Sequence, residues 1–595
     1  MDTNQTTVER RADDYRQLID IGIALSVERD PARLRERILL EAKAFTNADA
    51  GTLYLKNKGT ELTFQIVRND SLNVAMGGTT GVEIKFPPVP LVTGSGGPNM
   101  HNVASYCAIT GEMVNIEDAY AHTDRFDFSG TKRFDQQTGY RSQSFLTVPL
   151  KNHLGFVIGV LQLINARDST GKVIPFGEPI LPMVNALASQ AAVSIDNRML
   201  IEELKHLLDS FIALIAAAID TKSPYTGGHC QRVPALAEML VRAACETKEG
   251  PFKEFNLTEA EWYELHVACW LHDCGKVTTP EYIVDKATKL EAIYDRIHEI
   301  RTRVEVLKRD AEIAMLKGRL AGGDEAALKA AYDAEIAALD DDFAFVGTCN
   351  VGGEFMAPDK IERLKKIAGR TWTRTLSDRT GISYAEKRRR DARPEQPLPA
   401  EEKLLEDRYD HISPRERPPL TAPGNQWGFN MKAPEHEFNL GEIYNLSISR
   451  GTLTEQDRYK INEHMVQTIV MLESLPFPRH LRRVPEYAGG HHEKLDGTGY
   501  PRGLKKEVMS VPARVMAIAD IFEALTAADR PYKPPKTLSE SIKIMRFMVK
   551  DQHIDPDLFK LFLESGVYKE YAKQNLKPEQ IDEVDLTFLT AEKRD

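Results

Sequence analysis

The first third of the chain changes its pattern of apolar positions in a way that predicts an α+β domain. Apolar residues follow helical spacing over residues 13–45, and short alternating segments separated by turn residues begin at Gly51. A second strand pair is predicted at residues 144–150 and 157–165. The polar region between them, residues 101–141, is too long for a simple connection. The pattern over residues 1–195 therefore predicts a domain of the kind that acts as a sensor.

A nearly unbroken helix is predicted next, over residues 180–219. Its apolar residues recur at spacings of 3, 4 and 7, which is typical of a two-helix coiled coil; they are Leu187, Val193, Leu200, Leu204, Leu207, Phe211 and Leu214. This spacing thus predicts that residues 196–219 are a linker helix that forms a parallel homodimer. The alternative is a helix that packs only on its own domain.

The rest of the chain has helical patterning with one interruption. Apolar positions alternate at spacings of 3 and 4 over residues 290–311 and again over 328–343, on either side of Gly322-Gly323, which predicts an antiparallel helical hairpin. Residues 345–440 are expected to be irregular, and their basic run 387–390 either contacts an acidic partner or is solvated surface. Further helices are predicted at residues 454–474, 476–490, 508–528, 537–551 and 555–575.

Composition and charge narrow the class of protein. A chain of 595 residues is too long for one hydrophobic core, so about three domains are expected. A net charge of −11 gives no broad basic field, which argues against binding to DNA. The six cysteines lack CxxC spacing and favour a reducing compartment. No apolar run approaches the ~20 residues of a membrane span, and no signal peptide is evident, so we expect a cytoplasmic protein.

The candidate chemistry centres on His272 and Asp273, at the end of the apolar helical segment 265–271. Adjacent residues on a helix point roughly 100° apart, so these two are expected to serve two neighbouring ions rather than to grip one. The second half of the chain supplies further imidazoles and carboxylates at His229, His464, His491, His492 and Asp520. Such mixed nitrogen and oxygen ligands suit Fe, Mn or Zn.

Several motifs of the first domain resemble a GAF domain, particularly the kind found in cyclic-nucleotide phosphodiesterases and cyclases. The motifs lie at residues 110–120, 125–127, 134–135, 138–141, 144–150 and 159–165. The resemblance implies an antiparallel sheet with helices and a pocket for a small molecule or cyclic nucleotide. Where the nucleotide-binding subset has an Asn-Lys pair, this chain has Asn165-Ala166, and only Phe176 and Glu178 match the rest. The alternative is a dimerisation and signal-relay domain.

The second half resembles the HD-GYP family, a subgroup of the HD superfamily of metal-dependent phosphohydrolases. The His-Asp pair, the His491-His492 doublet, the run Asp496-Gly497-Thr498-Gly499-Tyr500-Pro501, Asp520 and the run Arg530-Pro531-Tyr532-Lys533 occur in the order of the family. The resemblance implies an all-α helical bundle with two divalent metal ions, for which we expect Fe or Mn.

The resemblance also assigns roles to these residues. One ion would be held by His229, His272 and Asp520, and the other by His464, His491 and His492, with Asp273 bridging both. A hydroxide between the ions would be the nucleophile. Lys276, with Asp273, would act in catalysis by neutralising a phosphate oxygen. Further substrate contacts would come from Tyr500, Arg530 and Lys533, and Asp496 would brace the tyrosine-bearing loop or a ligand histidine. Purely structural roles for Lys276, Arg530, Lys533 and this loop remain open.

Two departures from the family pattern affect the prediction. Tyr225 stands where some members have a glutamate that binds a third metal, so we expect two ions. The segment between His272 and His464 is much longer than in the family, which implies an insertion at residues 291–446 inside a catalytic domain formed by residues 220–290 and 447–575. We expect this insertion to pack beside the mouth of the site and to restrict access.

The resemblance implies a signal-regulated cyclic di-GMP phosphodiesterase that opens the ring to linear pGpG, with further hydrolysis to GMP left open. Two alternatives remain. One is a catalytically weak module that only binds a nucleotide or another protein. The other is a phosphohydrolase of a different cyclic dinucleotide.

Overall fold

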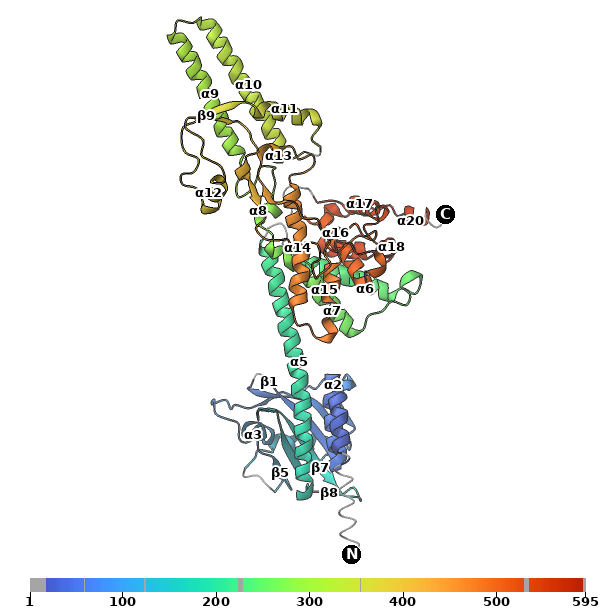
Figure 1. Cartoon of the computed structure of the whole chain (residues 1–595). Coiled ribbons are helices and arrows are strands. Elements are labelled where there is room, and N and C mark those ends of the chain that lie inside the picture. The colour runs from blue at the N-terminus through green and yellow to red at the C-terminus, as the bar shows by residue number, and fades with distance from the viewer. Residues whose placement is uncertain are drawn as a thin grey trace. The chain divides into compact units, whose positions relative to one another are not determined.

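The computed structural model describes residues 16, 18–57, 59–121, 125–222, 228–353, 355–528 and 535–591. The chain divides into two compact units with the boundary between Leu208 and Asp209 (Figure 1). The helix α5 (Leu181–Lys222) begins in the first unit and ends in the second. Within the described ranges, no helix combines the length and apolar character that a membrane crossing requires.

The first unit is built on an antiparallel sheet, as predicted. Its main path has the order β3-β2-β1-β7-β6-β5, and two short strands pair with β2 and β7. The central strand β1 (Ala48–Asn57) places Leu53 opposite Ile66 of β2 and Leu161 of β7. The remaining strands are β2 (Glu61–Asn69), β3 (Val74–Gly77), β4 (Val89–Pro90), β5 (Val114–Ile116), β6 (Phe145–Lys151), β7 (Val157–Arg167) and β8 (Val173–Ile174).

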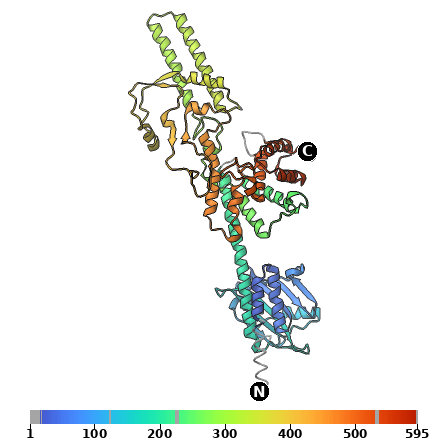
Figure 2. The same cartoon turned by 45° about the vertical axis from the view of Figure 1, so that its right-hand side comes forward.

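Helices cover both faces of this sheet. Residues 18–27, α2 (Pro31–Thr46) and the first part of α5 pack on one face, where Leu39, Leu163 and Leu187 are fully buried (Figure 2). The helix α3 (Val103–Thr110) packs on the other face through Cys107. The helical pattern at 13–45 is interrupted after residue 27, because the Asp30 side chain accepts hydrogen bonds from the first amides of α2. The long polar region contains α3, β5 and α4 (Ser129–Thr138).

Asn165 has a structural role. It is the asparagine that is followed by Ala166, where the nucleotide-binding subset of GAF domains has a lysine. Its Oδ1 accepts hydrogen bonds from the amides of Gln143 and Ser144 at 2.7 and 3.2 Å. Its Nδ2 donates to Tyr140 Oη and to the Arg141 carbonyl at 2.9 and 2.8 Å. The side chain is buried and the backbone has a φ of +59°. Asn165 therefore ties the approach to β6 against the end of β7.

The second unit is largely helical. The helices outside the insertion segment are α6 (His229–Glu246), α7 (Glu259–Leu271), α8 (Glu281–Val284), α14 (Glu455–Ser474), α15 (Val484–Gly489), α16 (Val511–Thr526), α17 (Leu538–Lys550), α18 (Pro556–Glu564), α19 (Val567–Asn575) and α20 (Phe588–Ala591). The prediction of a helix over residues 476–490 is wrong except for α15. Pro476 and Pro478, which follow α14, prevent a helix at the start of this stretch. The helix predicted over 555–575 is divided at Gly566, which has a φ of +75°.

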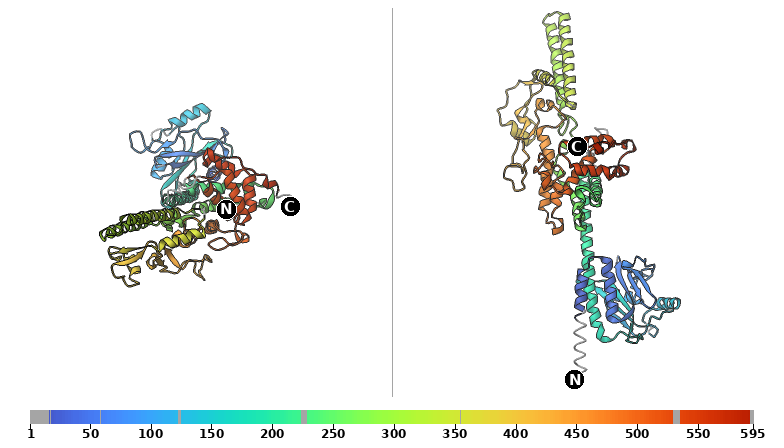
Figure 3. Two further views of the ribbon diagram at one scale, coloured as in Figure 1. Left: turned by 90° about the horizontal axis from the view of Figure 1, so that it is seen from above. Right: turned by 90° about the vertical axis from the view of Figure 1, so that its right-hand side faces the viewer.

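The segment predicted as an insertion, residues 291–446, contains the expected hairpin and a core of its own. The antiparallel helices α9 (Ile297–Leu320) and α10 (Glu325–Val351) lie side by side in all views (Figure 3). Ile300, Leu339 and Val346 are buried against α11 (Pro358–Ala368). Both ends of the segment meet at Lys289, whose buried ammonium donates to the carbonyls of Leu446 and Ile448 at 3.0 and 2.7 Å. The segment therefore leaves and re-enters the helical unit at one place.

The stretch predicted as irregular is more ordered than expected. It forms two short antiparallel sheets, β9 (Thr371–Arg374) with β10 (Ala400–Lys403) and β11 (Ile412–Pro414) with β12 (His436–Asn439). It also contains the helices α12 (Tyr384–Arg390) and α13 (Glu442–Leu446).

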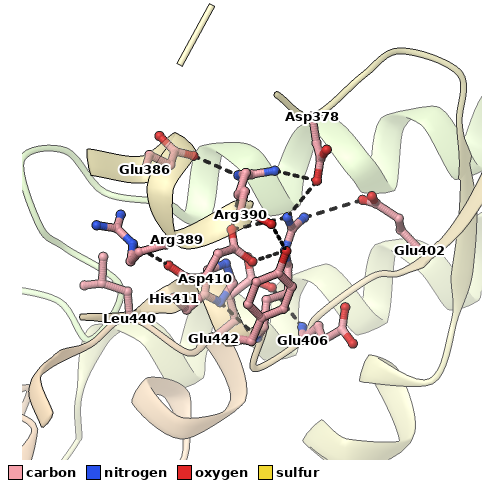
Figure 4. A network of polar contacts seen from close by, with 12 residues as sticks. Asp378, Glu386, Arg389, Arg390, Glu402, Glu406, Asp410, His411, Leu440 and Glu442 are labelled. Carbon is pink, nitrogen blue, oxygen red and sulfur yellow. Dashed lines mark hydrogen bonds and ion pairs between the residues drawn. The ribbon is translucent and has the colours of Figure 1, made fainter. Parts of the chain in front are cut away.

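An ion-pair network explains how a stretch so poor in apolar residues is held together. Arg390 pairs with Asp378, Glu386 and Asp410 at 2.7, 3.0 and 3.2 Å (Figure 4). Arg389 donates to the Asp410 carbonyl at 3.0 Å, whereas Arg388 remains exposed. Part of the basic run at 387–390 is thus used within the segment itself.

We expect Asn165→Ala to destabilise the first unit by about 2–3 kcal/mol, because it leaves buried amide and carbonyl groups without partners. Calorimetric unfolding of the full chain would measure the loss. Asn57→Ala, at an exposed position on β1, is the control and should change the transition little. Equal effects of the two substitutions would contradict the role given to Asn165.

Candidate metal centre

The His-Asp pair lies where a helix ends. The helix α7 stops at Leu271, His272 keeps helical dihedral angles, and Asp273 leaves them with φ −108° and ψ 13°. The change of backbone direction brings the two side chains together, with His272 Nε2 3.2 Å from Asp273 Oδ2. The expectation that these neighbours point apart is therefore wrong, because Asp273 is not part of the helix.

A glycine brings this turn against the helix that bears His464. The turn Cys274–Thr278 packs on α14, and the Gly275 amide donates to Thr468 Oγ1 at 2.9 Å. A Cβ atom on Gly275 would lie 2.0 Å from the His464 carbonyl oxygen. Only glycine permits this approach. The sequence Asp273-Cys274-Gly275 thus places the carboxylate of Asp273 beside His464.

Seven predicted side chains form two adjoining groups. His229, at the start of α6, joins His272, Asp273 and Asp520 of α16 in the first group; His464 joins His491 and His492, which follow α15, in the second. Within each group the ligand atoms lie within 4.8 Å of one another. The helix α6 begins at His229 itself, slightly earlier than the predicted start near Arg232.

Asp273 connects the two groups. Its Oδ2 lies 3.1 Å from His229 Nε2, on the side of the first group. Its Oδ1 lies 3.3 Å from His464 Nε2 and 3.9 Å from His491 Nε2, on the side of the second. In the first group, Asp520 Oδ1 is 3.3 Å from His229 Nε2. The carboxylate of Asp273 therefore offers one oxygen to each group.

Several ligand atoms of this centre are buried without a hydrogen-bond partner in the described part of the chain. They are Nε2 of His272, His464 and His491, and Oδ1 of Asp273. The Nδ1 atoms of these three histidines donate to the carbonyls of Cys269, Ile461 and Ala488 at 2.7, 2.5 and 2.8 Å. Because Nδ1 carries the proton, each Nε2 presents a lone pair. Unpartnered lone pairs of nitrogen and oxygen are what a divalent cation requires, so these residues fit metal binding.

Glu523 orients His229 and is absent from the sequence analysis. Its Oε2 accepts a hydrogen bond from His229 Nδ1 at 2.5 Å, and its Oε1 accepts one from Arg232 Nε at 2.7 Å. Burial would lower the pKa of His229, but the carboxylates of Asp273, Asp520 and Glu523 outweigh it and hold that pKa well above its usual value. The spacing of Asp520 and Glu523 on one helix face could have revealed this residue.

Glu493 is a second residue that the sequence analysis missed. Its carboxylate is buried and accepts hydrogen bonds from the amides of Arg502, Gly503 and Leu504 at 2.7, 3.2 and 2.8 Å. Asp496 is exposed and accepts from the amide and hydroxyl of Thr498, both at 2.8 Å, so it braces the loop rather than a histidine. The position of Glu493 directly after the histidine doublet was the available signal.

Tyr500 and Lys276 face the same cavity as the histidines. The Tyr500 ring stacks on His492 with centroids 4.8 Å apart and an interplanar angle of 15°. Lys276 Nζ lies 2.6 Å from Asp273 Oδ2. The cavity has a volume of about 220 Å³ and is lined by His229, Arg232, Lys276, Ile461, His464, His492, Tyr500, Asp520, Glu523, Ala524 and Ala527.

The charge of Lys276 is maintained by its neighbours. Burial alone would lower its pKa, but the carboxylates of Asp273 and Asp520 outweigh burial and raise it. Lys276 therefore brings a positive charge to the cavity. Arg530, Lys533 and Tyr225 lie outside the described residues, so the expectations for them remain predictions.

Comparison with protein-family models finds two domains. The GAF domain model matches residues 30–195, and the HD domain model matches residues 399–558. The second match contains His464, His491, His492 and Asp520 but begins after His229, His272 and Asp273.

Curated relatives resemble only parts of the chain. A 3'3'-cGAMP-specific phosphodiesterase 1 of Vibrio cholerae is 39% identical over 116 residues, which cover 20% of this chain and 26% of that protein. A cyclic di-GMP phosphodiesterase of Pseudomonas aeruginosa is 43% identical over 79 residues, or 13% of this chain and 18% of that protein. The chain thus spans about a quarter or less of the length of these relatives.

Among solved structures, the GAF domain of an Acinetobacter phosphoenolpyruvate-protein phosphotransferase is 16% identical and has a TM-score of 0.23. It covers 32% of this chain and 97% of that one. Together with the antiparallel sheet and the helical second unit, the family matches identify the chain as one that combines an N-terminal GAF domain with a largely helical region containing an HD domain.

Proposed function

We propose that the chain is a metal-dependent phosphodiesterase that hydrolyses cyclic di-GMP to pGpG. The observation that carries this proposal is the position of Asp273, which offers one carboxylate oxygen to each of two groups of buried histidines. The similarity to phosphodiesterases of cyclic dinucleotides supports the reaction class. A second candidate substrate is 3'3'-cGAMP, because a relative is named for that activity.

The two groups would hold two divalent ions, Fe or Mn. His229, His272 and Asp520 would bind one, and His464, His491 and His492 would bind the other, with Asp273 shared between them. Bound there, such ions would supply a nucleophile by lowering the pKa of water and would neutralise charge on the phosphodiester.

The side chains around the two groups would position the reactants. Glu523 holds the His229 ring so that Nε2 faces the first group. Lys276 would neutralise a phosphate oxygen in the transition state, because its charged Nζ lies in the cavity beside Asp273. Tyr500 would contact the substrate from the cavity wall that it forms by stacking on His492. Arg530 and Lys533 would add further substrate contacts.

We further propose that the GAF domain regulates this activity and that the chain is a homodimer. The GAF ligand would be a small molecule or cyclic nucleotide. The dimer would form through α5, on which Leu200, Leu204, Leu207, Phe211 and Leu214 follow heptad spacing and are between 42% and 64% exposed. Leu187 is buried in the first unit, so this residue of the predicted seam belongs to its own domain.

We expect Asp273→Ala to reduce turnover of cyclic di-GMP by about a hundredfold or more, because it removes the group shared by both ions. Product formation by Mn-loaded and Fe-loaded protein, with 3'3'-cGAMP assayed in parallel, measures the effect. Lys308→Ala, in the inserted hairpin, is the control and should keep full activity. Absence of turnover by the unchanged protein with both substrates would favour the alternative of a nucleotide-binding or protein-interaction module.

Glu523→Ala is expected to weaken metal binding about tenfold to a hundredfold, because His229 loses the acceptor that fixes its ring. Glu523→Gln, which keeps the shape of the side chain, should have a smaller effect. Metal titration followed by calorimetry gives the affinities. Glu507→Ala, at an exposed position, should bind metal normally. Normal affinity in the Glu523→Ala variant would show that this carboxylate does not orient His229.

Replacing Leu204 and Leu214 together by glutamate should convert the dimer to a monomer, because charges would enter an apolar seam. Sedimentation velocity measures the change in mass. Ala213→Glu with Ala217→Glu adds the same charges at exposed positions of α5 outside the predicted apolar seam and should leave the dimer intact. A monomeric unchanged protein would rule out the proposed dimer.

A further inference from the structure

Residues 420–432, here called the strap, lie within the insertion segment between β11 and β12. Phe429 of the strap is 4% exposed and packs against Val466 and Ile469, which are fully buried. Trp427 stacks beside Phe429 with ring centroids 5.8 Å apart. Thr421 Oγ1 lies 2.9 Å from the Tyr459 hydroxyl, also on α14. The strap is therefore anchored on the helix that bears His464.

The strap has a defined shape of its own. The Asn425 side chain accepts hydrogen bonds from the amides of Trp427 and Phe429 at 3.1 and 2.9 Å. Its Nδ2 donates to the carbonyls of Ala422 and Phe429 at 3.0 and 2.8 Å. Gly428 has a φ of +73°, which glycine adopts without strain. These contacts fix the main chain at the points where it meets its neighbour.

That neighbour is the tyrosine loop, residues 498–504. The Asn430 amide donates to the Pro501 carbonyl at 2.8 Å, and Arg502 Nε donates to the Trp427 carbonyl at 2.8 Å. The Arg502 guanidinium lies 5.7 Å from the centroid of the Phe429 ring. It also donates to Glu473 of α14 at 2.7 Å. Arg502 thus joins the loop, the strap and α14.

The tyrosine loop is held on its other side by the metal centre. Glu493 accepts hydrogen bonds from three loop amides, and the Tyr500 amide donates to the His492 carbonyl at 3.2 Å. The Tyr500 ring stacks on His492. A continuous set of contacts therefore runs from the strap through Arg502 and Pro501 to Tyr500 and His492.

We propose that the strap positions the tyrosine loop for a cyclic dinucleotide, with Arg502 and Asn430 as positioning residues. The proposal rests on the proposed function and assigns the insertion a part in it. No residue of the described insertion segment lines the cavity. The segment therefore acts through its contacts with the tyrosine loop rather than by covering the site. It sets where the Tyr500 side chain meets the substrate and leaves the metal ligands in place.

The test compares Arg502→Ala with Arg417→Ala, an exposed arginine of the same segment. We expect Arg502→Ala to speed hydrogen exchange of the amides of Tyr500 and residues 502–504 about tenfold, because the loop loses its link to the strap. The KM for cyclic di-GMP should rise about tenfold, whereas turnover of bis(p-nitrophenyl) phosphate, which is too small to need the loop, should stay within about twofold. Arg502→Lys should restore part of the change.

The outcomes separate this inference from the proposed function. Unchanged exchange in the loop, or an equal loss of activity toward both substrates, would overturn the inference. An equal loss would mean that Arg502 merely supports the metal centre. If the unchanged protein hydrolyses neither substrate, the proposed function fails, and the exchange measurement still decides whether the strap holds the loop.

Discussion

The second unit buries a cluster of imidazoles and carboxylates in which several ligand atoms have no hydrogen-bond partner among the described residues. Asp273 is 2% exposed, and His272, His464 and His491 are between 0% and 3% exposed. Burying an ionised carboxylate is costly unless opposite charge or hydrogen bonds compensate. Lys276 supplies part of that compensation at 2.6 Å. The remaining lone pairs converge on common points, which is favourable when cations bind there and unfavourable when only the protein chain is present. Cations bound at these points would therefore stabilise the folded unit.

The ligand set could be predicted from the sequence because its residue types are unusual and their order is characteristic. His229, His464 and Asp520 come from helices far apart along the chain, and the resemblance placed them together as the structure does. Their supporting residues were less predictable. Glu493 and Glu523 are single glutamates in helical or turn sequences, and their roles depend on which amide or imidazole lies opposite. Which group lies opposite each glutamate is determined by tertiary packing, which residue spacing in the sequence does not report. The direction of Asp273 was mispredicted for a related reason, because the helix was assumed to continue past Leu271.

The fold was predictable where apolar spacing determines it and less so where polar contacts do. The sheet of the first unit and the hairpin of the insertion follow from alternation and heptad-like spacing. Residues 371–414 have few apolar positions, and their order comes from ion pairs such as those of Arg390 and Arg408 with Asp410. Burial would raise the pKa of Asp410, but Arg408 and Arg390 outweigh it and keep that pKa low. No periodicity in the sequence reports which carboxylate an arginine will meet.

The segment predicted as an insertion is compatible with the assembled candidate ligands because its two ends lie close together. Lys289 bonds to carbonyls on the far side of the insertion, so the two ends are adjacent and the entropic cost of the long connection grows only slowly with its length. The contact between Gly275 and α14 closes the helical unit independently of the inserted residues. The strap meets the tyrosine loop through Asn430 and Arg502, so the proposed effect of this segment on substrate binding would pass through these contacts to Tyr500. Under this proposal, residues 420–432 would influence substrate binding without altering a metal ligand.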